Sequence, residues 1–352
     1  MEKLVGYAVV GLGVGKAHVK GAIAAEGCKL VALCDIRPEQ LANAQENIPG
    51  AQDAKAYTDF AEMLKDPEID VVSICTPSGL HADMAVQALR AGKHVLVEKP
   101  MDIAVDKILE IEKARRETGL KVGGIFQNRR NAIMEPFKAA VDSGRLGEIY
   151  AAFFRVNWHR DDNYFLANGG WRGTWAMDGG GSLMNQGVHT VDLMQWLLGD
   201  VESIKSNMRV VNHRIETEDF TQSTVKFKRG TVATFISTTC AYPGMGTELQ
   251  VTGTDGSIHI DGDKVIAWRI KGDDMAGEEA EMKEKFGGKG VSVSADPTVV
   301  RGHSYQIQDM VDAVRFDRDP MVGPMEATKA VRIINAVYES ARTGKEIIFT
   351  TR

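Results

Sequence analysis

Cysteine is scarce in this 352-residue chain, which contains only four, at Cys28, Cys34, Cys75 and Cys240. None of them forms a Cys-x-x-Cys pair, and three lie within apolar, strand-like runs. This usage is typical of reduced thiols in a cytoplasmic protein, and it disfavours a disulfide framework or a zinc site. We therefore predict a cytoplasmic protein whose cysteines stay unpaired.

Long apolar runs and excess positive charge are also missing. No run of about 18 apolar residues occurs, so the sequence predicts no membrane span. The start, Met1-Glu2-Lys3-Leu4-Val5, leads directly into a strand pattern and lacks the layout of a secretion signal. The formal net charge is −6 and no block of Lys and Arg stands out. We therefore expect neither nucleic acid nor a membrane as a partner.

The sequence does contain enough apolar residues, 43% in all, for a large buried core. At this length more than one domain is expected. The first part alternates short apolar runs with helical patterns, which predicts a parallel sheet covered on both faces. We assign residues 1–125 to such a doubly wound α/β domain. The expected strands are 4–10, 29–34, 70–75, 94–97 and 121–125, with helices at 79–91 and 102–118 among others.

The pattern changes after about residue 125, where strand-like segments follow one another through turn-rich links. We predict an α+β domain over residues 126–352, with a mainly antiparallel sheet that has one open face. Residues 271–290, rich in Lys, Glu, Asp and Gly, are expected to form an exposed, mobile loop. Residues 307–314 and 330–338 carry apolar stripes of two core helices. The expected strands are 148–157, 203–212, 220–228, 231–239, 247–252 and 257–260.

A glycine-rich turn, Gly11-Leu12-Gly13-Val14-Gly15, follows the first expected strand and opens the first helix. A pyrophosphate can approach a backbone closely only where side chains are absent, and a helix N-terminus offers free N–H groups. The spacing departs from the usual fingerprint, because the third glycine is one residue early and Lys16 occupies the expected position. The turn alone is weak evidence, since any tight strand–helix connection favours glycine.

The end of the second strand adds a carboxylate at the right distance. Asp35 lies 20 residues beyond Gly15, where a carboxylate can accept both ribose hydroxyls and repel a 2′-phosphate. Together with Gly11, Gly13 and Val14, it predicts NAD as the cofactor. Arg37 leaves NADP as the less favoured alternative, because an arginine can pair with a 2′-phosphate.

Three further clusters make a more specific pattern. One cluster, Cys75-Thr76-Pro77-Ser78-Gly79-Leu80-His81, begins at the last residue of the expected strand 70–75, and Glu98-Lys99-Pro100 follows the expected strand 94–97. A glycine triplet at 179–181 precedes Asn185 and His189. With these motifs the chain resembles the Gfo/Idh/MocA oxidoreductase family over nearly its whole length.

The resemblance implies a Rossmann domain, a second domain with an open-faced sheet, and an active site between them. It implies that Lys99 points at the substrate. Many members carry an aspartate and, four residues later, a histidine on one helix; here these positions hold Asn185 and His189. The dehydrogenase triad is therefore not carried over whole, and some members that oxidise nucleotide-linked sugars resemble the asparagine variant. The open sheet face and the resemblance together predict a homodimer or homotetramer.

The residue types support this chemistry independently. Residues four apart on a helix share a face, so Asn185 and His189 are expected to address one ligand. Oxidation of a carbinol requires the hydroxyl proton to leave, and a neutral imidazole with a pKa of about 6.5 can accept it. We favour His189 as the base and Lys99 as the polarising group; the reverse assignment stays open.

Other candidate residues complete the predicted site. Polar and aromatic side chains in loop-like stretches are expected to bind a sugar-like ligand, since aromatic faces stack on sugar C–H surfaces. No third ligand with recognisable spacing joins His189 and Asp192, so no metal is predicted. The substrate candidates are Gln127, Arg129, Trp158, Tyr164, Trp171, Arg172, Asn185 and His189; the additional cofactor candidates are Thr76, Pro77, His81, Glu98 and Lys99.

The leading functional hypothesis is an NAD-dependent dehydrogenase that oxidises a secondary hydroxyl of a sugar, sugar derivative or cyclic polyol. One alternative is a hydrolase or lyase that retains NAD and oxidises its sugar only transiently, and another is a nucleotide-sugar 3-dehydrogenase. A non-catalytic ligand sensor is disfavoured by the intact Lys99 and His189.

Overall fold

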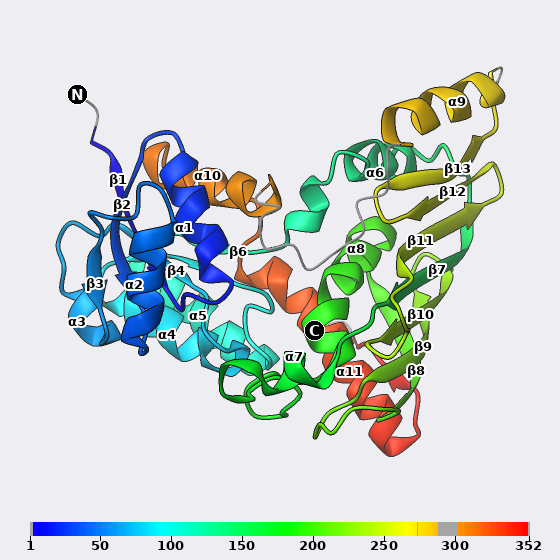
Figure 1. Ribbon diagram of the computed structural model, residues 1–352. Helices are drawn as coiled ribbons and strands as arrows, with labels where there is room; N and C mark the ends of the chain where they lie inside the picture. The colour runs from blue at the N-terminus through cyan, green and yellow to red at the C-terminus, as the bar shows by residue number, and fades with distance from the viewer. Residues whose placement is uncertain (1–2, 273, 288–300, 351–352) are drawn as a thin grey trace. The chain divides into compact units, whose positions relative to one another are not determined.

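The computed structural model describes residues 3–272, 274–287 and 301–350. The chain forms two compact units, each with its own sheet (Figure 1). The first unit combines Met1–Gln127 with Asp296–Val331, and the second combines Asn128–Ala295 with Arg332–Arg352. The chain therefore enters the first unit twice.

The first unit contains a six-stranded parallel sheet with strand order β3-β2-β1-β4-β5-β6, which is the order of a Rossmann domain. All six residues of β1 are buried, as expected for a strand covered on both faces. The predicted doubly wound fold is confirmed. The strands are β1 (Val5–Val10), β2 (Cys28–Cys34), β3 (Lys55–Tyr57), β4 (Val71–Ile74), β5 (His94–Val97) and β6 (Val122–Gly124).

Helices α1, α2 and α10 pack into one apolar cluster against this sheet, and α4 packs against α5 (Figure 1). The predicted stripe on α10 is confirmed, because Ile307, Met310 and Val311 are fully buried in that cluster. A Cβ added at Gly21 of α1 would lie 2.3 Å from Cδ1 of Ile307, so glycine permits this close packing. The helices are α1 (Gly15–Ala24), α2 (Pro38–Asn47), α3 (Phe60–Leu64), η1 (Ser78–Leu80), α4 (His81–Arg90), α5 (Val105–Thr118) and α10 (Arg301–Arg315).

The second unit contains an eight-stranded sheet with order β13-β12-β11-β7-β10-β9-β8-β14. Strands β7 and β10 pair in parallel and the other neighbours are antiparallel, so the predicted mainly antiparallel sheet is confirmed. Burial alternates along β7 and β9, which leaves one face more exposed than the other. The strands are β7 (Ile149–Asn157), β8 (Val201–Arg209), β9 (Phe220–Phe227), β10 (Val232–Thr238), β11 (Gly246–Gly253), β12 (Gly256–Asp261), β13 (Lys264–Ile270) and β14 (Ile347–Ile348).

Helix α8 lies against the buried face of this sheet together with the turn that precedes it (Figure 1). The predicted stripe from Ala330 to Tyr338 is buried within α11, as expected for a core helix. The boundary between the two units falls inside α11 and at η2. The remaining helices are η2 (Gln127–Arg130), α6 (Met134–Asp142), α7 (Asp162–Leu166), η3 (Ala167–Gly169), η4 (Ser182–Gly187), α8 (Val188–Leu198), α9 (Met275–Phe286) and α11 (Pro324–Thr343).

The prediction of a mobile loop over residues 271–290 is wrong for its described part, which contains helix α9. Asp274 caps this helix by accepting a hydrogen bond from the Gly277 N–H. Glu278 accepts one from the Trp268 indole of β13 at 2.9 Å, and Met282 is buried. The charged residues thus form the outer face of a helix that docks on β13. Residues 273 and 288–290 lie outside the described part.

No helix within the described residues combines the length and the apolar character needed to cross a bilayer.

Candidate active site

The three glycines after β1 have separate roles. Gly11 has φ +84° and approaches β4 so closely that a Cβ would lie 2.6 Å from the Cys75 carbonyl oxygen. A Cβ on Gly13 would meet nothing within 4 Å, so this position borders open space. A Cβ on Gly15 would lie 3.1 Å from Val9 and 3.2 Å from Cys75, at the contact between α1 and the sheet. Gly15 therefore supplies the close helix–strand packing expected of a third glycine, although it comes one residue early.

Asp35, at the end of β2, holds this turn in place. Its Oδ2 accepts a hydrogen bond from the Leu12 N–H at 2.8 Å, and the side chain is almost fully buried. Its Oδ1 accepts from the backbone N–H and the Nε of Arg37, at 3.0 and 3.2 Å. The guanidinium of Arg37 thus pairs with the carboxylate that disfavours a 2′-phosphate.

These residues fit a dinucleotide. Helix α1 begins after Val14 with no side-chain cap and no acidic residue in its first turn, so its N-terminal amides suit a pyrophosphate. Val14 is 47% exposed at that position. The open space beside Gly13 and the carboxylate of Asp35 supply the other two requirements, room for the phosphates and a ribose acceptor.

His81 connects the motifs that follow β4 and β5. Its Nδ1 lies 2.8 Å from the Pro100 carbonyl oxygen, and its Nε2 lies 2.8 Å from the Thr76 carbonyl oxygen. The ring is buried, whereas Thr76 and Pro77 are partly exposed. Of these cofactor candidates, Thr76 and Pro77 are therefore available to a ligand, and His81 holds their loop.

Glu98 is the centre of a buried hydrogen-bond network behind Lys99. Its Oε1 lies 2.9 Å from Nε2 of His18 and 3.0 Å from Nε2 of His303, and its Oε2 accepts from the Lys99 N–H at 2.9 Å. Burial alone would raise the pKa of Glu98, but hydrogen bonds from both histidines hold it well below its usual value. Glu98 thereby fixes the backbone of Lys99, whose side chain is partly buried.

The hydrogen-bond network continues from Glu98 through His18 to two buried hydroxyl groups. His18 Nδ1 lies 2.9 Å from the Ser73 hydroxyl, which lies 2.6 Å from the Tyr7 hydroxyl. Burial lowers the pKa of His18, so its ring is neutral at neutral pH. Each group is then satisfied if Tyr7 donates to Ser73, Ser73 to Nδ1, and Nε2 to Glu98. Motif spacing in the sequence does not indicate that His18 and His303 share Glu98 as a partner.

In the second unit, a buried carboxylate holds the glycine triplet. Glu218 Oε1 accepts hydrogen bonds from the N–H groups of Gly181 and Leu183, both at 3.0 Å, and from the Tyr338 hydroxyl at 2.8 Å. Its Oε2 accepts from the Ser182 hydroxyl at 2.6 Å. Burial outweighs these hydrogen bonds and raises the pKa of Glu218 to about 7. A Cβ on Gly181 would lie 1.8 Å from the Glu218 carbonyl oxygen, which explains the glycine.

The segment held by Glu218 is a π-helix, η4, that runs directly into α8. Asn185 lies in η4, and His189 is the second residue of α8, which continues η4 without a break. The two residues are thus four positions apart on one continuous helical segment, and the shared face expected of them stays a prediction. His189 is buried to 8% exposure.

Asn185 is embedded in a polar network. Its Nδ2 donates to Asp178 at 2.6 Å, and its Oδ1 accepts from the Tyr164 hydroxyl at 3.0 Å. Tyr164 lies in α7, and the guanidinium groups of Arg160 and Arg172 lie 5.1 and 4.7 Å from its ring. Four of these five residues come from the loop region before η4. Asp178 was not among the predicted residues, because nothing in its spacing relates it to Asn185.

The other predicted substrate residues have different surroundings. Arg129 forms a buried, two-pronged ion pair with Asp192 of α8 through Nε and Nη2, at 2.7 and 2.5 Å. Trp158 follows β7 and donates from its indole to Thr247 at 3.1 Å. The Arg172 guanidinium lies 4.9 Å from the Trp171 ring. Gln127 belongs to the first unit and the others to the second.

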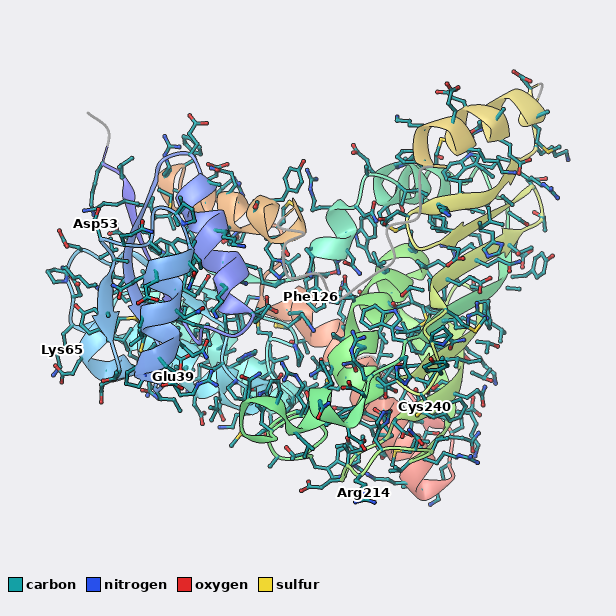
Figure 2. All side chains as sticks on the ribbon, viewed as in Figure 1. Glu39, Asp53, Lys65, Phe126, Arg214 and Cys240 are labelled. Carbon is teal, nitrogen blue, oxygen red and sulfur yellow. The ribbon has the colours of Figure 1, made fainter. Side chains whose placement is uncertain are left out.

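Among the described residues, two groups of three side chains offer ligand atoms close enough together to hold a metal ion. One is His18, Glu98 and His303, which are joined by the hydrogen bonds described above. The other is His213, Asp219 and Cys240; Cys240 follows β10 and is labelled in Figure 2. Asp219 already accepts three backbone N–H groups, and burial raises the pKa of the Cys240 thiol to about 12. All four cysteines are free. Both groups therefore have a structural explanation.

The doubly wound sheet, the glycine turn and Asp35 define a dinucleotide-binding domain that suits NAD. A family model described as "Oxidoreductase family, NAD-binding Rossmann fold" matches residues 5–126, and the GFO/IDH/MocA C-terminal domain matches residues 135–259. The chain belongs to the Gfo/Idh/MocA family and is an NAD(P)-dependent oxidoreductase.

Individual relatives agree with this assignment. The chain is similar to the WlbA dehydrogenase from Bordetella pertussis, crystallised with NADH and UDP-GlcNAcA, at 30% identity and a TM-score of 0.87, over 100% of this chain and 99% of that one. It is 31% identical to 1,5-anhydro-D-fructose reductase from Ensifer adhaerens, over 68% of this chain and 70% of that one. It is 26% identical to scyllo-inositol 2-dehydrogenase (NAD(+)) from Bacillus subtilis, over 99% and 97%.

Proposed function

We propose that this protein oxidises a secondary hydroxyl of a sugar, sugar derivative or cyclic polyol. The observation that carries the proposal is the position of Lys99, which follows β5 at the carboxyl edge of a sheet whose first turn is built for a dinucleotide. Ligands of doubly wound sheets bind at that edge. The names of the relatives, an inositol dehydrogenase and an anhydrofructose reductase, support substrates of this class.

The proposed reaction needs one residue that accepts a proton and one that stabilises negative charge. His189 accepts the hydroxyl proton at its imidazole, and the Lys99 ammonium stabilises the developing alkoxide oxygen. A bound nicotinamide would supply the acceptor for the hydride that leaves the carbinol carbon. Glu98 keeps Lys99 in place through the 2.9 Å hydrogen bond to its backbone N–H. Because the two groups belong to different units, the assignment rests on the motifs and on each residue's own surroundings.

The first form of this proposal to test is that the substrate is an anion. Arg160 and Arg172 both stack on Tyr164, which is hydrogen-bonded to Asn185. Guanidinium groups beside a hydroxyl-binding amide suit a sugar that carries a carboxylate or phosphate. The likeness to WlbA crystallised with UDP-GlcNAcA supports a nucleotide-linked sugar as the leading candidate.

The test is NAD reduction across a panel of UDP-sugars, sugar acids, free sugars and inositols. We expect stoichiometric accumulation of NADH with at least one member. A hydrolase or lyase that recycles its cofactor would release product without NADH, so that result would replace the proposed net oxidation with the alternative.

Variants then test the two catalytic groups. Lys99→Ala is expected to reduce kcat by about 10³-fold, which is within the range of a lost proton-transfer or charge contact, while the Kd for NAD changes little. Lys113→Ala, on the exposed side of α5, is the matched control and should behave like the wild type. His189→Ala should flatten the acidic limb of the kcat/KM profile around pH ~6.5. An unaltered limb would make Lys99 the base.

We also infer a homo-oligomer, formed through the more exposed face of the eight-stranded sheet. That face carries Arg155, Glu248 and His259, with Glu248 paired to both of the others at 2.5 and 2.6 Å. Light scattering of the purified chain tests this inference. A monomer at micromolar concentration would contradict it, and Ile236→Asp on β10 of that face should lower the mass measured for an oligomer.

A further inference from the structure

The side-chain amide of Asn185 is held at both ends. Its Nδ2 donates to Asp178 Oδ1 at 2.6 Å, and its Oδ1 accepts from the Tyr164 hydroxyl at 3.0 Å. Asp178 is 1% exposed, and its Oδ2 accepts from the Gly173 N–H at 2.8 Å. An ionised carboxylate can only accept hydrogen bonds, so it must face the amino end of the amide. Asp178 therefore determines which way round Asn185 sits.

Tyr164 enforces the same orientation from the other side. Its hydroxyl accepts from Gln186 Nε2 at 2.8 Å, which leaves its own proton to donate to Asn185 Oδ1. Burial raises the pKa of Tyr164, so the phenol keeps that proton at neutral pH. Hydrogen bonds thus run in one direction from Gln186 through Tyr164 and Asn185 to Asp178. A flipped amide would place two donors together at one end and two acceptors at the other.

We propose that Asp178 is a positioning residue of the reaction, which fixes the Asn185 amide so that a substrate hydroxyl meets one defined end of it. This inference rests on the proposed function, since it assigns Asn185 to a hydroxyl-bearing ligand. Asn185 supplies no charge itself, and the carboxylate seven residues earlier supplies the charge that orders it. Residues on α7, in the loop and in η4 thereby act as one unit toward a polyhydroxylated substrate.

Exchange of the two side chains gives a direct test. Asn185→Asp alone places two carboxylates at hydrogen-bond distance, and such pairs cannot both ionise without cost. Asp178→Asn alone removes the group that sets the amide's orientation. The double variant D178N/N185D restores every bond with the roles reversed: the new amide donates to the new carboxylate and accepts from Gly173, and the carboxylate accepts from Tyr164. Rescue is therefore expected only if the two residues act as a pair.

The first measurement is thermal unfolding of the four full-length proteins at pH 5.5 and pH 8. We expect Asn185→Asp to lower Tm by ~4 °C or more at pH 8, with a smaller loss at pH 5.5, and the double variant to recover most of that loss. The matched control is Asp161→Asn, which changes the cap of α7 at the Tyr164 N–H without touching the amide. It should show no such pH dependence. Additive effects of the two single substitutions would overturn the pairing.

The second measurement is turnover. Asp178→Asn is expected to lower kcat by ~10-fold or more with little change in the Kd for NAD, and the double variant to regain at least half of that loss on a logarithmic scale. If Asp178→Asn leaves kcat and KM unchanged while the stability coupling holds, Asp178 only supports the fold and the proposal fails.

Failure of the proposed function is distinguishable from failure of this inference. If the wild type does not reduce NAD with any sugar of the panel, the proposed oxidation is wrong. Binding of a panel sugar, followed by its effect on Tm, then replaces turnover as the measurement. A panel sugar that raises the Tm of the wild type and the double variant, but not of Asp178→Asn, would support the positioning role. Equal shifts in all four proteins, or no shift with any sugar, would overturn it.

Discussion

Two glycines only two residues apart differ in what a side chain would encounter. A methyl group at Gly13 meets no atom within 4 Å, whereas one at Gly11 collides with the Cys75 carbonyl. The backbone at Gly11 also has φ +84°, which residues with a side chain rarely adopt. We predict that Gly13→Ala folds with a Tm within ~2 °C of the wild type but loses at least ~10-fold in NAD affinity, because the methyl occupies the space for the phosphates. Gly11→Ala should instead lower the stability itself.

Titration with NAD, followed by isothermal titration calorimetry, and thermal unfolding check this pair together. Gly92→Ala is the reference for a positive-φ glycine with open space around it, far along the chain from the turn. Unchanged NAD affinity in a stable Gly13→Ala protein would mean that the open space beside this residue is not where the cofactor binds.

At this scale, residues whose role depends on sequence-local geometry were predictable. Gly11, Gly13 and Asp35 were identified because a strand, a tight turn and a helix follow one another directly. Glu98, Glu218 and Asp178 have roles set by contacts with residues 35 to 205 positions away, or across an irregular loop, and no spacing rule encodes those contacts. Polar residues that are buried and fully hydrogen-bonded look the same in a sequence as exposed ones.

Among the elements, the turn before η4 depends on a single buried carboxyl group. Because the pKa of Glu218 is raised from 4.5 to about 7, the folded protein retains a proton that the unfolded chain has already lost between these values. The free energy of unfolding therefore falls as pH rises from about 4.5 to about 7, by about 3 kcal/mol, and this contribution is constant above pH 7. Glu218→Gln should abolish that slope, since its amide oxygen accepts the same three donors and its amide nitrogen can donate to the Ser182 hydroxyl.

Urea unfolding of both proteins from pH 5 to pH 8 measures this difference. Glu202→Gln, an exposed carboxyl group on β8, is the control and should leave the slope in place. Parallel curves for the wild type and Glu218→Gln would show that Glu218 is ionised throughout and that the hydrogen bonds outweigh its burial.

The elements themselves were largely predictable wherever a strict period governs them. The alternation in Phe220–Phe227 and Val232–Thr238 indicated strands, and the continuous apolar run of Val5–Val10 indicated a strand buried on both faces. Helix α9 was missed because its stability comes from one buried methionine and from Glu278 against β13, which leaves a composition typical of a loop. The π-helix was missed because its cause, Glu218, lies 31 residues after its end.

At the scale of the whole molecule, the chain returns to its first unit after leaving it. The apolar stripe of α10 could be predicted from its period, but a period does not say which sheet the stripe covers. The structure groups it with the Rossmann sheet, where Ile307, Met310 and Val311 join a cluster with residues of β1, α1 and α2. The end of the returning segment also pairs with β6, through the hydrogen bond from the Gly124 N–H to the Val322 carbonyl at 2.8 Å.

This arrangement predicts that the nucleotide-binding unit cannot be cut out as one continuous segment. A fragment of residues 3–127 would expose the surface that α10 covers, and the three buried side chains of α10 together contribute roughly 5–9 kcal/mol, comparable with the stability of a whole domain.

A Cβ at Gly302 would lie 2.7 Å from Cγ of Gln127, so a linker of about four glycines and serines can join residue 127 to residue 302. We expect the joined fragment, 3–127 with 302–331, to unfold cooperatively and bind NAD. We expect neither cooperative unfolding nor NAD binding from the fragment 3–127, or from the joined fragment that carries Ile307→Ser and Met310→Ser. Circular dichroism measures the unfolding, and titration with NAD measures the binding. Equal NAD affinity in the short fragment would mean that α10 contributes nothing to the fold of that unit.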